Sequence, residues 1–192
     1  MLNLLLFGPP GAGKGTQSNN LFAKYNLVHF STGESLRDEM AANSAIGKEA
    51  KVFLDRAEYV PDELILRIVK KKLIEFKHEN GIIFDGFPRT KAQAEALDIL
   101  MQETLNSEIN CMLALDVPDD KLVERMQERG IKLGRYEDQT EELIRKRLKI
   151  YKCYTEPVAE YYKKCNKFIA INGVGSVEQI FNRITSVIEE KI

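Results

Sequence analysis

A glycine-rich loop near the N-terminus carries the residues best suited to chemistry. It runs from Gly8 to Thr16 and reads GPPGAGKGT, after an apolar run and before a segment with helical character. Glycines have no Cβ, so successive backbone N–H groups can converge on one anion, and a helix that follows adds the positive end of its dipole. Lys14 supplies a full positive charge that can reach outer phosphates. The loop therefore predicts a site for the phosphates of a nucleotide.

Two oxygen-bearing side chains suit a magnesium ion near this loop. Gly15 stands where Ser or Thr is usual in phosphate-binding loops, and the hydroxyl of Thr16 follows one position later. Asp85 ends an apolar run, where a magnesium-linked carboxylate is expected. Magnesium keeps several waters, so we expect no direct protein ligand. The ion would be held by phosphates and water, with Asp85 and Thr16 nearby.

Basic side chains follow several of the other apolar runs. They are Arg37, Arg89, Arg125, Arg129, Arg135 and Arg147. So many cations around one pocket repel each other unless polyanions lie between them, and the arginine fork binds phosphate oxygens in pairs. Two phosphate-bearing substrates with magnesium would balance these charges. Phosphoryl transfer relies on positioning and electrostatics, so no Ser-His-Asp or Cys-His set is required. We interpret the isolated His29 and His78 as incidental.

Five short apolar runs predict the strands that position these groups. The runs are Leu2–Phe7, Leu27–Phe30, Ile82–Phe84, Cys111–Asp116 and Lys167–Ile171, with amphipathic stretches between them. Such alternation indicates an α/β fold, a five-stranded parallel sheet with helices on both faces. Ligands in such sheets gather beyond the carboxyl ends of the strands, which is where the polar residues stand.

Several sequence patterns predict where helices begin. Thr32 suits the N-cap of a helix that carries Arg37, and Asp138 with Glu141 forms a capping-box pattern. Ser176 with Gln179 and Thr90 with Gln93 form two more, so a capping role for Gln93 stays open beside a role in a site. We also expect a helical excursion over 39–59 and a short glycine-bounded loop over 130–138. Both are natural closing lobes around a transfer site.

The composition fits one compact globular domain. The chain has 192 residues, a net charge of −1 and three widely separated cysteines without a C-x-x-C pair. We therefore expect no nucleic-acid partner, no zinc site and no disulfide framework. The apolar run at the start is too short for a signal peptide, and no stretch approaches a membrane span. These features predict a cytoplasmic protein without a membrane partner. No coiled-coil pattern is present, which favours a monomer.

Taken together, the motifs resemble the adenylate kinase family over nearly the whole chain. The residues that carry the resemblance are Gly8–Thr16, Ser31-Thr32-Gly33, Arg37, Asp85–Thr90, Gln93, and Gly134 to Asp138. The resemblance implies magnesium-dependent transfer between ATP and AMP, giving two ADP. It also implies an AMP-binding lobe at 31–60, a short lid at 128–138, and a core of 1–30, 61–127 and 139–192. The long cysteine-bearing lid insertion of many bacterial relatives is absent.

The resemblance also implies roles for individual residues. On the ATP side it assigns Gly11, Ala12, Gly13, Lys14, Gly15, Thr16, Arg125, Arg129 and Gly175. On the AMP side it assigns Thr32, Arg37, Glu58, Tyr59, Val60, Gly86, Phe87, Pro88, Arg89, Gln93, Arg135 and Arg147. The catalytic set implied is Lys14, Asp85, Arg89, Arg129, Arg135 and Arg147.

Two other functions are weighed against this one. A UMP/CMP kinase shares the loop and the Asp-Gly-Phe-Pro-Arg run, but typically has Ala at the position of Thr32 and Asn at that of Thr90. Thr32 and Gln93 favour an adenine acceptor, because an amide can bond a purine edge in two places. A nucleotide switch or ATPase is opposed by Gly15 and by the second, acceptor-like site.

Overall fold

The computed structural model describes residues 1–191 and forms alternating strands and helices. The strands are β1 (Leu2–Phe7), β2 (Val28–Ser31), β3 (Gly81–Asp85), β4 (Cys111–Asp116) and β5 (Phe168–Asn172). The helices are α1 (Lys14–Tyr25), α2 (Thr32–Ala41), α3 (Ala45–Leu54), α4 (Asp62–Glu75), α5 (Lys91–Leu105), α6 (Asp119–Leu133), α7 (Glu141–Ile150), α8 (Glu156–Lys164) and α9 (Val177–Lys191). Short turns of 3-10 helix, η1 (Tyr136–Asp138), and π-helix, η2 (Tyr151–Thr155), lie between α6 and α8.

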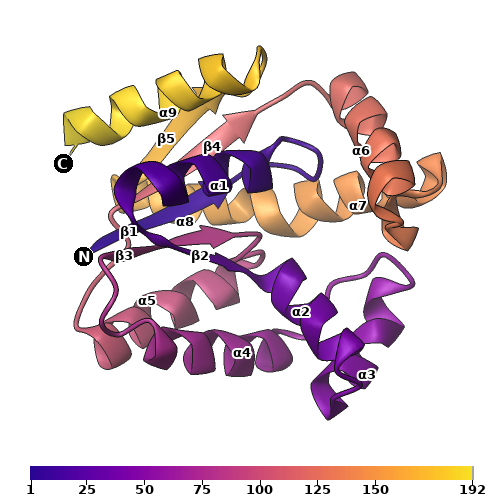
Figure 1. Cartoon of the computed structure of the whole chain (residues 1–192), viewed down its shortest axis with the longest axis horizontal. Helices are drawn as coiled ribbons and strands as arrows, with labels where there is room; N and C mark the ends of the chain where they lie inside the picture. The colour runs from indigo at the N-terminus through magenta and orange to yellow at the C-terminus, as the bar shows by residue number, and fades with distance from the viewer. Residues whose placement is uncertain (192) are drawn as a thin grey trace.

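Over these residues the strands form one parallel sheet in the order β2-β3-β1-β4-β5. The loop after β1 therefore leaves the centre of the sheet, with β3 and β4 on either side. Figure 1 shows α1 and α9 on one face and α4 and α5 on the other. The predicted α/β sheet and its strands are confirmed, with ends that differ by at most one residue from the predicted runs.

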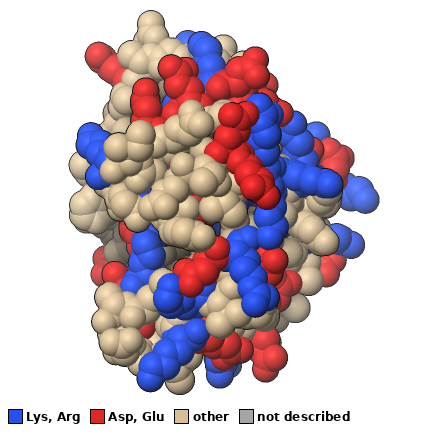
Figure 2. All heavy atoms as spheres, turned by 90° about the vertical axis from the view of Figure 1, so that its right-hand side faces the viewer, with Lys and Arg blue, Asp and Glu red and all other residues tan. Residues whose placement is uncertain are grey.

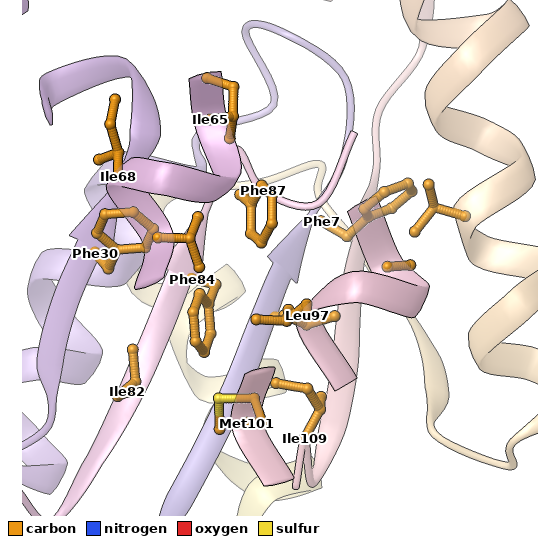
Figure 3. Close-up of a cluster of buried hydrophobic side chains, with 14 of the residues drawn as sticks. Phe7, Phe30, Ile65, Ile68, Ile82, Phe84, Phe87, Leu97, Met101 and Ile109 are labelled. Carbon is orange, nitrogen blue, oxygen red and sulfur yellow. The ribbon is translucent and has the colours of Figure 1, made fainter. Parts of the chain in front are cut away.

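Buried side chains on both faces hold the sheet in place. Alternate residues of β1 point to opposite faces, so Leu5 and Phe7 join one cluster and Leu4 and Leu6 join the other. Figure 3 shows the first cluster, in which Phe84 and Phe30 lie near the helices α4 and α5. Phe87 belongs to the same cluster, so the segment that follows β3 is anchored in the core. That anchor gives the residues next to it a defined position.

Two helical regions extend beyond the carboxyl ends of the strands (Figure 1). One is the pair α2 and α3, which packs together after β2. The other is the end of α6, the turn η1 and the start of α7. The helical excursion predicted over 39–59 is present in part, as the end of α2 and the whole of α3, whereas 55–59 are not helical. The space between these two regions is where the site lies.

Candidate active site

The glycine-rich loop adopts a backbone that requires glycine. Gly11 and Gly13 have φ angles of 83° and 95°, in the left-handed region that other residues rarely adopt. Helix α1 begins at Lys14, three residues before the predicted start, because Gly13 serves as its N-cap. Lys14 Nζ donates to the carbonyl oxygens of Gly8 at 2.7 Å and Pro9 at 3.0 Å. The ammonium group is thus held over the loop.

A cleft of about 730 Å³ opens above this loop. Its lining includes one predicted lysine and six predicted arginines: Lys14, Arg37, Arg89, Arg125, Arg129, Arg135 and Arg147. Loop residues Gly11, Gly13, Gly15 and Thr16 and the run Asp85 to Pro88 line it too. Figure 2 shows the molecule from the side of the cleft, with Lys and Arg side chains grouped along this face. The predicted convergence of cations on one sheet edge is confirmed.

Burial and charge shift the pKa values of two groups at the floor of the cleft. Burial lowers the pKa of Lys14 to about 8; the charge of Asp85 opposes the shift, and Arg89, Arg129 and Arg147 add to it. Burial alone would raise the pKa of Asp85, but the neighbouring His29 and Lys14 outweigh it and hold that pKa below its usual value. The carboxylate of Asp85 is therefore ionised at neutral pH.

His29 takes part in this arrangement, contrary to the sequence interpretation. Its Nε2 lies 3.6 Å from Asp85 Oδ2, and its Nδ1 lies 3.9 Å from Glu34 Oε2. In the register of the sheet, Ser31 of β2 lies beside Asp85 of β3. Parallel pairing thus brings His29 close to the end of β3, although the two residues are 56 positions apart. Sequence reasoning missed this contact because it treated each histidine alone.

A buried carboxylate holds two of the cleft arginines. Asp138 is fully buried, and its Oδ2 accepts a hydrogen bond from Arg129 Nε at 2.8 Å, with Nη2 2.7 Å away. Its Oδ1 accepts from Arg147 Nη1. Burial lowers the pKa of Arg147 to about 10, although Asp138 opposes the shift. The capping role predicted for Asp138 is wrong, because Thr140 caps α7 by accepting from Leu143 N.

The predicted glycine-bounded loop is shorter than expected. Helix α6 continues through Gly130 to Leu133 and ends at Gly134, which has a φ of 61°. A Cβ at Gly130 would lie 2.5 Å from the carbonyl oxygen of Asp138. Gly130 is thus needed for the close approach of η1 to the helix rather than for a turn. This approach places Asp138 beside Arg129.

A smaller cavity of about 60 Å³ lies on the side of α2 and α3. It shares Arg37, Tyr59 and Arg89 with the cleft and adds predicted residues Thr32, Glu58, Val60 and Gln93. Thr32 does not cap α2, because Ser31 is the N-cap and accepts from Glu34 N. Instead, Thr32 Oγ1 donates to the Gly86 carbonyl oxygen at 3.0 Å. The two cavities therefore adjoin one another through these shared residues.

Gln93 takes part in one half of the predicted capping box and also lines the smaller cavity. Thr90 caps α5 by accepting from Gln93 N at 3.1 Å, which confirms half of the predicted capping box. The reciprocal bond comes from Arg89 N rather than Thr90 N, and it reaches Gln93 Oε1 at 2.7 Å. Gln93 Nε2 donates to Asp62 Oδ1 at 2.5 Å. Gln93 therefore lines the cavity and fixes the backbone of Arg89. Asp62, which sequence reasoning missed, fixes Gln93 in turn.

Two predicted site residues lie outside both cavities. Ala12 is fully buried in the core beneath the loop. Gly175 is exposed in the turn before α9, with a φ of 129°. The capping box of Ser176 and Gln179 in this turn is confirmed by both of its hydrogen bonds. Gln17 of α1 donates to the carbonyl oxygen of Val177 at 3.0 Å, so this turn lies against the helix that follows the loop.

The π-turn η2 contributes two cleft residues that sequence reasoning missed, Tyr151 and Thr155. Burial raises the pKa of Tyr151, so its hydroxyl stays protonated. Pro157 follows the turn and has no N–H for the carbonyl four residues before it. The backbone hydrogen-bond pattern of the helix changes there, and Glu156 N donates to the carbonyl oxygen of Tyr151, five residues earlier. A proline inside a helical stretch was the signal available in the sequence.

Among residues 1–191, no group of three or more His, Cys, Asp and Glu side chains is placed to bind a metal ion. Within the same range, the helices are all too short or too polar to cross a membrane.

The chain is similar to known proteins along nearly all of its length. The family model described as adenylate kinase matches residues 6–167. A protein named adenylate kinase from Bacteroides fragilis is 45% identical over 189 residues, which cover 98% of this chain and 99% of the relative. Adenylate kinases from Flavobacterium johnsoniae and Flavobacterium psychrophilum are 46% and 44% identical, over 98% of this chain and 99% and 98% of the relatives.

Proposed function

The chain belongs to the adenylate kinase family, and we propose that its cleft transfers a phosphoryl group from magnesium-bound ATP to AMP, giving two ADP. The observation that carries the proposal is the convergence of Lys14 and six arginines on one cleft that continues into a second cavity. Two polyanions can balance this charge, whereas one nucleotide would leave the arginines of the second cavity without a partner.

ATP is assigned to the side of the loop and α6. The backbone N–H groups of the loop and the start of α1 suit its phosphates, and Lys14 adds a positive charge. Arg129 suits the same phosphates, and Arg125 suits the nucleoside end because it stands one helical turn earlier in α6. Gly175 suits the adenine through its backbone, because its turn adjoins α1.

AMP is assigned to the second cavity. Arg37 and Arg89 suit the phosphate of the acceptor, and Thr32, Gln93 and the segment Glu58 to Val60 line the space for its base. The same cavity includes Gly86 and Phe87, and Pro88 lines the neighbouring cleft. Arg135 and Arg147 suit the phosphates that meet between the two nucleotides. In-line positioning and electrostatic stabilisation of the transferred group are the chemistry that these residues supply.

The residues at the end of β3 fit a magnesium ion. Asp85 is ionised, lines the cleft near Lys14 and lies next to Gly15, where a Cβ would be 3.5 Å from its Oδ2. Asp85 and Thr16 would hold the ion through water, while phosphate oxygens coordinate it directly. When bound, the ion neutralises charge on the phosphates that face Lys14 and the arginines.

The two regions beyond the sheet are proposed as moving lobes. Residues 31–60 form the proposed AMP-binding lobe, and residues 128–138 form the proposed lid. Closure of both would exclude water, which otherwise hydrolyses the donor. Both lobes project from the core, so a monomer leaves them free to move.

We further assign the chain to the cytoplasm, since the exposed thiols of Cys153 and Cys165 suit a reducing compartment.

An acceptor panel tests the proposed function. Purified protein with ATP and magnesium is given AMP, CMP, UMP or GMP, and formation of each diphosphate is measured. We expect AMP to exceed the other acceptors by about 100-fold or more, because a site built on polar contacts rejects a base that leaves them unpaired. Equal or faster use of CMP or UMP would contradict the assignment.

A further inference from the structure

Thr155 joins two residues of the acceptor side from a distant part of the chain. It is the last residue of η2, is 4% exposed, and lines the cleft. Its Oγ1 donates to the carbonyl oxygen of Arg89 at 2.9 Å and lies 2.7 Å from the hydroxyl oxygen of Tyr59. These partners are 66 and 96 residues away along the chain.

The direction of the second bond follows from counting protons. A threonine hydroxyl has one proton, and Thr155 uses it on the Arg89 carbonyl oxygen. Tyr59 must therefore donate to Thr155. Valine in place of Thr155 has a similar shape but can neither donate nor accept, so it would break both bonds. Serine would keep both.

Both partners of Thr155 are connected to one arginine, Arg89. The ring of Tyr59 lies 5.2 Å from the central carbon of the Arg89 guanidinium, within cation–π range. Arg89 Nε donates to the Gly86 carbonyl oxygen at 2.6 Å, and Arg89 N donates to Gln93 Oε1. Arg89 is thus held at its N–H, its carbonyl, its side-chain Nε and its guanidinium face. Thr155 provides the carbonyl contact and orients the ring behind the guanidinium.

We propose that Thr155 is a positioning residue of the acceptor site, which aligns the Arg89 guanidinium with the acceptor phosphate by holding the Arg89 backbone and the Tyr59 ring. The proposal rests on the proposed function, because it needs Arg89 to bind the phosphate of AMP. Thr155 does not itself contact the reacting atoms. Its contribution passes through Arg89, so it concerns the phosphate of the acceptor rather than the base.

Because the effect concerns the phosphate and not the base, a positioning role can be distinguished from a purely structural one by comparing ligands with and without the phosphate. Dissociation constants for AMP and for adenosine, which lacks the phosphate, are measured by NMR titration of the intact chain. For Thr155→Val we expect AMP to bind about tenfold more weakly, because two hydrogen bonds of modest net value are lost. Adenosine should change by less than about twofold. Thr155→Ser should restore AMP affinity to within about threefold of the natural protein.

Tyr59→Phe provides a second, milder variant. It keeps the ring behind Arg89 and removes only the bond to Thr155, so AMP affinity should fall by roughly threefold while adenosine affinity stays the same. This variant carries the test if Thr155→Val does not fold. Equal weakening of AMP and adenosine in the folded variants would overturn the proposal, as would unchanged AMP affinity.

A double-mutant cycle checks that the effect passes through Arg89. In an Arg89→Ala background, Thr155→Val should cause no further loss of AMP affinity, because the group that it aligns is gone. A further tenfold loss would show that Thr155 acts elsewhere and would overturn the proposal. Measuring AMP binding and phosphorylation by the natural protein separates the two hypotheses. If the natural protein neither binds nor phosphorylates AMP, the proposed function is refuted. If it is an active kinase and Thr155→Val binds AMP equally well, only the role of Thr155 is refuted.

Discussion

The two sides of the cleft hold their arginines in different ways. On the side of the proposed lid, Arg129 and Arg147 share the buried carboxylate of Asp138. On the side of the proposed acceptor, Arg89 is held by neutral groups, and within residues 1–191 no carboxylate lies within ion-pair distance of it. A shared carboxylate balances charge before any phosphate binds, but it competes with that phosphate. Neutral groups fix the direction of a guanidinium and leave its charge available.

The difference suits the two proposed substrates. ATP brings several phosphate charges and can compete with Asp138 for the lid-side arginines. AMP brings a single phosphate, so an arginine that already faces it without a counter-charge offers the stronger contact. Each of the following experiments changes one side of this comparison or the contact that joins the two sides.

The largest effect is expected from removing the principal cation of either side. Lys14→Ala and Arg89→Ala should each lower turnover by about 10³-fold or more, by analogy with arginine fingers, while the fold stays intact. Steady-state rates and circular dichroism measure the two outcomes. Arg145→Ala is the matched control, because Arg145 is exposed on α7 and pairs with Glu141. Near-normal turnover in either cleft variant would contradict the site assignment.

Asp138→Asn removes the counter-charge of the lid side alone. Breaking a buried ion pair leaves uncompensated charge, and we expect a loss of about 3–5 kcal/mol in the free energy of unfolding without ligand. Saturating ATP should recover part of that loss, since its phosphates replace the carboxylate. Denaturant unfolding with and without ATP provides the measurement.

Asp119→Asn is the control for this variant, because Asp119 forms an exposed ion pair with Lys152. It should change the free energy of unfolding by less than about 1 kcal/mol. If the two variants were equally stable, the balancing role of Asp138 would be wrong.

The pH dependence of binding should differ between the sides. The pKa of Lys14 is lowered to about 8, so its ammonium is mostly charged at pH 7 and mostly neutral by pH 9. Phosphate favours the charged form, so ATP binding should take up a proton and weaken by up to about tenfold between pH 7.5 and 9. AMP affinity, which depends on arginines, should change by less than about twofold. Calorimetry in buffers of different ionisation enthalpy measures both.

Lys14→Arg is the control for the pH experiment, since arginine stays charged throughout this range. The ATP affinity of that variant should be flat with pH. A flat profile for the natural protein would show that Lys14 does not titrate near pH 8.

The smallest effect is expected from a surface contact that joins the sides. Lys146 Nζ on α7 lies 3.1 Å from Glu58 Oε1 and donates to the Arg56 carbonyl oxygen at 2.7 Å. Both side chains are partly exposed, so Lys146→Met, which removes the charge pair and leaves Glu58 in place, should change the KM for AMP by less than about twofold. A larger change would mean that the two sides are coupled through this charge pair.

The sequence predicted correctly those features of the fold and the site that depend only on residues close together in the chain. The strands, the glycine-rich loop, the Thr90 cap and the box at Ser176 each follow from a few adjacent residues. The cations at the sheet edge were also found, because the carboxyl ends of parallel strands meet there.

The missed features depend on contacts between distant segments. Asp138 has the sequence pattern of a cap, and only the approach of η1 to Gly130 turns it toward Arg129 and Arg147. His29 gains its carboxylate neighbour from the pairing of β2 with β3. Thr155 reaches Arg89 from the π-turn η2, across 66 positions of the chain. In each case tertiary packing rather than local propensity decided the contact.

The central place of β1 has a consequence for synthesis on the ribosome. β1 is the first strand made, yet its two neighbours, β3 and β4, begin only at Gly81 and Cys111. A nascent chain of 80 residues therefore carries Leu4, Leu5 and Leu6 with no partner strand on either edge, and such exposed apolar strands are what chaperones bind. The strand and loop that form the floor of the cleft are translated first but can reach their final shape only after more than half of the protein has been made.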